Sequence, residues 1–341
     1  MNIGEIAKRA GVSRSTVSYV LSGKRPVSEE VRARVERVIK ESGYRPSATA
    51  RALAQGSTRA FGLVIPPMGG HLSIDQLHFV GSVAEAAADH DYDVLLSPSG
   101  REEAFDRMLG ERRVDGVIVM ETVLHDARVV RLLEQSMPCV TIGRTGSDAE
   151  HGWVDLDYAG LVTTAVERLA ELGHRRIALV NRPQALLDRE YGPAYRALDA
   201  FEKTVVELGL QGRAVCCEDE QSAGLECARA LLEEDPALTA LVTINERSLA
   251  GVLRGLRQAG LRLPDDFSLV AVTSQDNACG LSPQVTAADV PTAEMGRRAV
   301  EALHRAVTGP ATSFDHVLLR PDLVERDTLG PAPDPGSVHP R

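Results

Sequence analysis

At 341 residues the chain is too long for a single hydrophobic core, because domains usually hold about 100 to 200 residues. Its net charge of -10 argues against a nucleic-acid-binding surface over the whole chain, but residues 1–60 carry 12 Lys and Arg against 5 Asp and Glu, a balance of +7. The remaining 26 basic and 43 acidic residues belong to residues 61–341, so a small basic unit precedes a large acidic body.

The five cysteines form no CxxC pair and have no histidines nearby at zinc-binding spacing. This pattern predicts neither a disulfide framework nor a metal site. No run of 18 apolar residues occurs, and the N-terminus lacks the apolar core of a signal peptide. We therefore expect a soluble protein of the cytoplasm, associated with the nucleoid, with no membrane contact, no metal and no cofactor.

Two short helices joined by a glycine turn are predicted at the N-terminus. Asn2 with Glu5 three positions later has the pattern of a capping box for a helix over residues 3–10. Gly11 can adopt the positive φ of a tight turn, and Ser13 can cap the next helix. This arrangement predicts a helix-turn-helix.

A third helix is predicted from Ser28 to a stop at Gly43, completing a headpiece over residues 1–46. Residues 47–54 are good helix formers, but two turns are too few to persist alone in water. We expect that segment to be helical only when docked. Residues 47–60 then connect the headpiece to the rest of the chain.

From Phe61 onward, strands alternate with helices in two series, which predicts an α/β fold with parallel sheets wrapped by helices. The first series has strands FGLVI, YDVLLS, VDGVIVM and PCVTIG, with helices near 75–89, 101–110 and 127–135. The second has strands RIALV, TALVTI and FSLVAV, with helices near 158–172, 194–208, 222–234 and 246–259. Two similar lobes in tandem are expected.

A further helix near 293–307 follows the second series, so we expect the chain to return to the first lobe before it ends in the second. The expected first lobe is about 61–157 and 287–311, and the second is about 158–286 and 312–329. The tail 330–341, rich in Pro and Gly, is expected to be disordered.

The second helix of a helix-turn-helix enters the major groove of DNA and presents its N-terminal side chains to base edges. The candidate base-reading residues are Arg14, Ser15 and Tyr19, with Arg14 able to bind guanine through two hydrogen bonds. The alternative is a solvated helical face. Hydroxyl groups suit phosphate oxygens, and the candidates for the DNA backbone are Ser13, Thr16, Ser18, Ser28 and Tyr44.

The segments GVSRSTVSYVLSG and GYRPSATARALAQGSTRAFGLVIP resemble the lactose/galactose repressor (LacI/GalR) family, and the resemblance runs from residue 2 to about 329. It implies a transcriptional repressor that binds double-stranded operator DNA as a homodimer. It also implies that 47–54 is a hinge helix, with Ala50 and Leu53 at the minor groove and Leu53 wedged between base pairs. Packing of Leu53 on its own lobe is the alternative. Tyr19 departs from the family, because most members have Arg there.

The body resembles the family's effector domain, a fold shared with periplasmic sugar-binding proteins, through VDLDYAG, LAELGHRRIALV and LRLPDDFSLVAV. This resemblance implies a small-molecule effector, a sugar or another metabolite, in the cleft between the lobes. Tyr191 and Thr273 replace the Arg and Asp that clamp sugar hydroxyls in many relatives. Asn245 matches a cleft Asn, and Glu246 stands for the usual Asp.

Arg189 is a candidate substitute for the missing Arg, with a solvated position as the alternative. Strand-end capping is the alternative for Asn245. His71 and Asp75 follow the first strand, at the edge where a parallel sheet presents ligand-binding residues, but such residues can equally be solvated. Aromatic residues are only 4% of the chain, which weakens the prediction of a sugar ligand.

Two other functions compete with an effector-controlled repressor. A DNA-bound enzyme is disfavoured, because the chain has no GxxxxGK[ST], GxGxxG, HExxH or GxSxG motif. A regulator without any small-molecule effector stays open, since both charged sugar clamps are replaced. The tail has no heptad pattern, so we expect a dimer without a tetramerisation segment.

Overall fold

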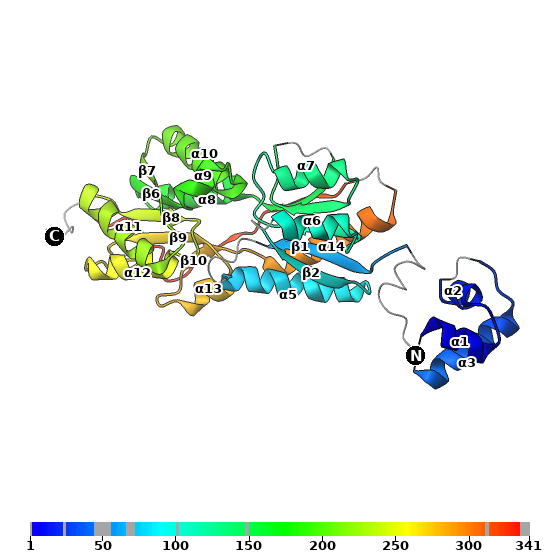
Figure 1. Cartoon of the computed structure of the whole chain (residues 1–341). Coiled ribbons are helices and arrows are strands. Elements are labelled where there is room, and N and C mark those ends of the chain that lie inside the picture. The colour runs from blue at the N-terminus through cyan, green and yellow to red at the C-terminus, as the bar shows by residue number, and fades with distance from the viewer. Residues whose placement is uncertain are drawn as a thin grey trace.

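The computed structural model describes residues 2–22, 25–43, 56–65, 72–99, 102–146, 150–310 and 314–334. They form a three-helix headpiece and two α/β lobes, and Figure 1 shows the two lobes lying side by side. This architecture confirms the predicted fold class. None of the helices in these ranges is long and apolar enough to cross a membrane.

The headpiece consists of α1 (Ile3–Ala10), α2 (Arg14–Ser22) and α3 (Glu29–Ser42). Each helix contributes one fully buried side chain to a common core, namely Ile6, Val17 and Val35. Three short helices that are marginal alone thereby stabilise one another through burial of apolar surface.

Local sequence sets the ends of these helices. The Asn2 side chain accepts a hydrogen bond from the Glu5 backbone N–H (3.1 Å), and Asn2 N donates to Glu5 Oε2 (2.9 Å), so the predicted capping box is present. The chain leaves α1 at Gly11 (φ +65°) and α3 at Gly43 (φ +60°), in the left-handed conformation that favours glycine.

The first lobe contains a six-stranded parallel sheet in the order β11-β5-β4-β3-β1-β2. Helices α5 (Ile74–Asp89) and α14 (Thr292–Thr308) cover one face, and α6 (Glu102–Gly110) and α7 (Ala127–Glu134) cover the other. The strands are β1 (Ala60–Ile65), β2 (Asp93–Pro98), β3 (Gly116–Val119), β4 (Cys139–Ile142), β5 (Gly152–Leu156) and β11 (His316–Leu319).

The second lobe repeats this plan with a sheet in the order β12-β10-β9-β8-β6-β7, in which only the β10–β12 pair is antiparallel. Helices α8 (Tyr158–Glu171) and α10 (Gly192–Glu207) pack on one face, and α11 (Gln221–Glu234) and α12 (Leu249–Gln258) on the other. The strands are β6 (Arg176–Asn181), β7 (Gln211–Cys216), β8 (Ala240–Thr243), β9 (Ser268–Val272), β10 (Thr286–Ala288) and β12 (Leu323–Val324), with the short helices α9 (Gln184–Asp188) and α13 (Gln275–Gly280) between them.

The chain does return to the first lobe with α14, as expected, but the assignment of 312–329 to the second lobe is wrong for its first part. Strand β11 pairs in parallel with β5, so residues 316–319 complete the first sheet, and only β12 joins the second. The edge of the first sheet leaves unpaired backbone groups on β5, and β11 satisfies them.

The beginning of the tail is also ordered, contrary to the prediction for 330–341. Gly330 N donates to Ser268 Oγ (3.1 Å), and its carbonyl oxygen accepts from the same hydroxyl (3.1 Å). Ala332 N donates to the carbonyl oxygen of Leu172 (2.8 Å). These bonds attach the segment to the second lobe, because without them buried polar groups would have no hydrogen-bond partners.

Candidate functional site

The N-terminal turn of α2 is an exposed cluster of polar side chains. Ser13 Oγ accepts from the Thr16 backbone N–H (3.0 Å), so Ser13 caps α2, as expected. The same hydroxyl lies 2.8 Å from Thr16 Oγ1 and 2.7 Å from Ser15 Oγ. Ser13, Arg14 and Ser15 are exposed, whereas Thr16 and Ser18 are half-buried.

The Arg14 side chain lies over the first turn of α1. Its Nη2 is 2.7 Å from the point that a Cβ on Gly4 would occupy, so glycine at that position makes room for the guanidinium. Further along α2, the guanidinium of Arg25 lies 5.2 Å from the centroid of the half-buried Tyr19 ring. A cation therefore lies beside Tyr19, at the position where the family resemblance implies an Arg.

The cations of the described part of the headpiece are not neutralised by local ion pairs. Within residues 2–22 and 25–43, no Lys or Arg forms an ion pair with a carboxylate of the described chain, whereas such pairs are common in the two lobes. Ser28 precedes α3, is exposed and makes no capping hydrogen bond through its side chain. Tyr44, Ala50 and Leu53 lie outside the described residues.

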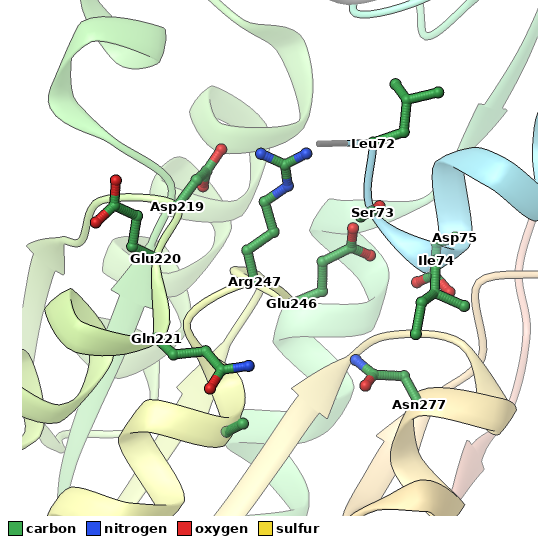
Figure 2. Close-up of a pocket in the computed structure, with 11 residues that line it drawn as sticks. Leu72, Ser73, Ile74, Asp75, Asp219, Glu220, Gln221, Glu246, Arg247 and Asn277 are labelled. Atoms are coloured by element: carbon green, nitrogen blue, oxygen red, sulfur yellow. The ribbon is translucent and has the colours of Figure 1, made fainter. Parts of the chain in front are cut away.

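Between the lobes lie two adjoining hollows. The outer one, about 480 Å³, is drawn in Figure 2; the inner one is about 120 Å³. Asp75 of α5 and Glu246, which follows β8, line both. Tyr191 lines the inner hollow. Three of the predicted cleft residues are therefore brought together from opposite lobes.

Glu246 reaches the cleft because the expected helix 246–259 begins later. The turn after β8 extends to Ser248, and α12 starts at Leu249. Glu246 then points toward Ser73 and Asp75 at the start of α5 (Figure 2). Burial, a hydrogen bond with Asp75 and the charge of Asp75 raise the pKa of Glu246 to about 8.

Asp75 is buried at the first turn of α5, with 6% of its surface exposed. Its Oδ2 accepts from the backbone N–H of Ser274 (3.3 Å), which links the lobes, but its Oδ1 has no donor among the described residues. When both acids are ionised, neither can donate to the other. A protonated Glu246 can donate to Asp75, and this hydrogen bond adds to burial, which is the largest cause of the raised pKa of Glu246.

The structure does not place Asn245, Thr273 and Arg189 in the cleft as predicted. Asn245 is fully buried, and its Nδ2 donates to the carbonyl oxygen of Cys217 (2.8 Å), so the strand-end capping alternative applies. Thr273 is fully buried, and its Oγ1 accepts from Asn277 Nδ2 (2.8 Å). Arg189 is exposed at the end of α9. His71 lies outside the described residues.

Sequence reasoning missed Arg182, which directly follows β6. Its Nε and Nη2 donate to the two carboxylate oxygens of Asp219 (3.0 and 2.7 Å), and its guanidinium carbon lies 5.6 Å from the centroid of the Tyr191 ring. Its position at the carboxyl end of a buried parallel strand was the available signal.

Arg247 was also missed. Its Nη2 donates to Gln76 Oε1 (3.2 Å), a hydrogen bond between the lobes. In Figure 2 its guanidinium extends between Asp219 and the segment that leads into α5. Within the described residues, no group of three or more His, Cys, Asp or Glu is arranged to hold a metal ion.

Comparisons with known proteins give one consistent result. Residues 2–47 match the model for bacterial regulatory proteins of the lacI family, and residues 166–329 match that for a periplasmic binding protein-like domain. The chain is 32% identical to the HTH-type transcriptional regulator AglR of Rhizobium meliloti (strain 1021), over 98% of this chain and 96% of the relative. It is 29% identical to the ribose operon repressor of Escherichia coli (strain K12), over 94% and 98%.

Solved structures agree with this result. A complex of the transcriptional regulator CelR with cellobiose has a TM-score of 0.71 at 27% identity, covering 96% of this chain and 99% of that chain. A Lac repressor dimer bound to operator and the anti-inducer ONPF has a TM-score of 0.80 at 23% identity, covering 96% and 98%, which shows the shared fold.

Proposed function

The chain belongs to the lacI family of bacterial regulatory proteins and is a DNA-binding transcriptional regulator rather than an enzyme, and on that premise we propose that it is a repressor that binds a palindromic operator as a homodimer. The observation that carries the proposal is the N-terminus of α2, where exposed polar side chains lie on a headpiece whose cations have no carboxylate partners among the described residues. Such a surface suits phosphate groups and base edges.

In this proposal α2 lies in the major groove. Arg14 leaves its position over Gly4 to bind a base edge, Ser15 contacts a neighbouring base, and Tyr19 reads the position that Arg reads in most of the family. The hydroxyls of Thr16, Ser18, Ser28 and Tyr44 contact phosphates, together with Ser13 to the extent that its capping role leaves a lone pair free. Ala50 and Leu53 meet the minor groove, a role that rests on the family resemblance.

Dimerisation fits an apolar surface on the first lobe. Leu77 on α5 is 54% exposed, and Leu96 on the edge strand β2 is 48% exposed. A helix face and a sheet edge of this kind are apolar surfaces that a second copy can bury, and a twofold operator requires two headpieces. The protein then acts in the cytoplasm, where its DNA is.

Control by a small molecule is supported by the interlobe cleft. Polar groups of both lobes converge on hollows of about 480 and 120 Å³, so a ligand that contacts both lobes changes their closure. A relative in complex with cellobiose has the same fold. A regulator without an effector is the second candidate, favoured by Tyr191 and Thr273 in place of the clamping Arg and Asp.

Selection of bound sequences from random DNA tests the proposed function. The full chain should select a twofold-symmetric site, and the chain without residues 1–59 should lose all binding while it stays a dimer in light scattering. Selection of an asymmetric site, or a monomeric full chain, contradicts the proposal. A thermal-shift screen with metabolites separates the two regulatory candidates, because a ligand of the folded state raises the melting temperature.

A further inference from the structure

The interlobe cleft carries an excess of carboxylates over cations. Asp75, Glu121, Asp155 and Glu246 line the inner hollow, whose only lining cation among the described residues is Arg182. That arginine is held by the two oxygens of Asp219, and Asp155 is paired with Arg144 (2.8 Å). Glu121 accepts from Gln76 Nε2 (3.4 Å), and Asp75 and Glu246 are left facing each other across the lobes.

The Asp75 carboxylate has an acceptor that the protein does not use. It is more than nine-tenths buried, and its Oδ1 lacks a donor among the described residues, although the side chain lines both hollows. Burying a carboxylate oxygen without a hydrogen bond costs free energy. A ligand that donates a hydrogen bond to this oxygen removes that cost, which favours its binding. The site therefore requires a donor rather than an acceptor.

The charged and titratable groups around Glu246 also indicate that the site favours a positively charged donor. Asp75 faces it from α5, Arg182 from the end of β6, Arg247 from its own turn, and Tyr158 and Tyr191 from the second-lobe side. Arg182 is occupied by Asp219, and Arg247 by Gln76. The positive N-terminus of α5 is matched by Asp75 in its own first turn. The surroundings thus favour a further positive charge.

We propose that the effector of this cleft carries a protonated primary amine, which binds between the carboxylates of Asp75 and Glu246. The inference rests on the proposal that the cleft binds a small-molecule effector and names the chemistry of that effector. An ammonium group has three N–H donors and no acceptor, so it donates to Asp75 Oδ1 and to Glu246 at once. A metal ion needs more ligands than these two acids provide.

Binding is coupled to a proton. In the empty cleft Glu246 holds a proton near neutral pH and contacts Asp75, but Asp75 Oδ1 stays without a donor. The ammonium takes the place of that proton and also donates to Oδ1. The ligand keeps its own charge, the Glu246 carboxyl becomes a carboxylate, and its proton passes to solvent. One bound ammonium therefore releases up to one proton, and its affinity increases as the pH approaches 8.

Calorimetry on the full chain near neutral pH, in buffers of different ionisation enthalpy, tests the proposal. The probes are glucosamine and 1,4-diaminobutane as amines, glucose and N-acetylglucosamine as neutral counterparts, glucose 6-phosphate as an anion, and MgCl₂ alone. We expect binding with proton release for at least one amine and not for its neutral counterpart. A response to glucosamine alone identifies an amino sugar, and a response to the diamine alone identifies an aliphatic amine.

Glu246→Gln keeps the shape of the side chain but removes its charge and its titration. It should weaken amine binding by about tenfold or more and abolish proton release, as expected when one charged hydrogen bond is removed. Asp75→Asn should have the same direction of effect. Glu218→Gln, an exposed acid of the second lobe outside both hollows, is the matched control and should bind as the wild type does.

The outcomes separate this inference from the proposed function. Binding of a neutral or anionic probe, or of Mg²⁺, without an advantage for the amines overturns the ammonium site but leaves an effector cleft. Amine binding that is unchanged in Glu246→Gln also overturns it. No response to any probe, in binding or in operator affinity, counts against both.

Discussion

Asp155 on β5 of the first lobe pairs with Arg196 on α10 of the second, with 3.5 Å between Oδ2 and Nη1, and the same oxygen accepts from Arg144 Nε at 2.8 Å. The carboxylate is 2% exposed, so this ion pair between the lobes is buried. Removing one member of a buried pair leaves the other charge uncompensated, which costs far more than the loss of an exposed pair.

Asp155→Asn should therefore lower the free energy of unfolding by about 3–5 kcal/mol. The matched control is Asp199→Asn, because Asp199 pairs with Lys203 on the exposed side of the same helix α10 and is 52% exposed. That variant should lose less than about 1 kcal/mol. Urea unfolding of both variants measures the difference, and equal losses would show that the interlobe pair has no special role.

The stability of the body should depend on pH through Glu246. Its pKa in the folded protein is raised to about 8, above that of an unfolded glutamate, so the folded state holds the proton more tightly. The stabilising contribution is present in full at acid pH below the unfolded pKa and is lost as the pH rises through 8. The decrease should be smaller in Glu246→Gln. Thermal unfolding across this range gives the slopes, and parallel slopes for the two proteins refute the prediction.

The C-terminal segment should contribute to the free energy of unfolding only through the residues that form hydrogen bonds with the second lobe. A chain ended at Leu329 loses the Gly330 carbonyl that His174 Nε2 (3.1 Å) and Ser268 contact, and two buried polar groups are then left without a partner. We expect a loss of about 1–3 kcal/mol for each such group. A chain ended at Asp334 keeps all of these bonds and should unfold as the full chain does. Equal stability of the two truncated chains contradicts this prediction.

Substitutions at three polar residues of the headpiece should have different effects on DNA binding. Arg14→Ala should lose specificity at one operator position, at a cost of about 1–3 kcal/mol, because one base edge loses its partner. Ser28→Ala should weaken binding to all DNA sequences alike. It should leave the stability of the headpiece unchanged, since this hydroxyl makes no capping bond. Ser13→Ala should also destabilise the headpiece by about 1 kcal/mol through loss of the α2 cap. Binding curves on operator variants with single base changes measure these effects. An equal loss of affinity for all variants in Arg14→Ala would exclude base reading by Arg14.

Leu53→Ala should reduce DNA bending. If Leu53 wedges between base pairs, its loss removes the kink but leaves the major-groove contacts of α2 in place. Specific binding should weaken, while salt-sensitive nonspecific binding from the basic headpiece stays. A gel-mobility bending assay with the selected operator measures this. An unchanged bend angle rules out the wedge.

Local signals in the sequence determined much of the molecule. The capping box at Asn2 and the glycine turn at Gly11 set the headpiece helices, because helix ends depend on neighbouring residues. Alternation of buried strands with amphipathic helices indicated two parallel-sheet lobes, because this periodicity can also be read from neighbouring residues. The short strand β11 was beyond such reasoning, since four residues carry too little periodicity to show which sheet they join.

The cleft was decided by tertiary structure. Gln76 and Arg247 are 171 residues apart in the chain, and only the docking of two lobes brings them into contact. The start of α12 at Leu249 left Glu246 in a turn that faces Asp75, whereas the strand end directed Asn245 inward to its own lobe. Sequence reasoning could name Asp75 and Glu246 separately. Their shared environment, and hence the raised pKa of Glu246, depends on burial between surfaces that no local pattern describes.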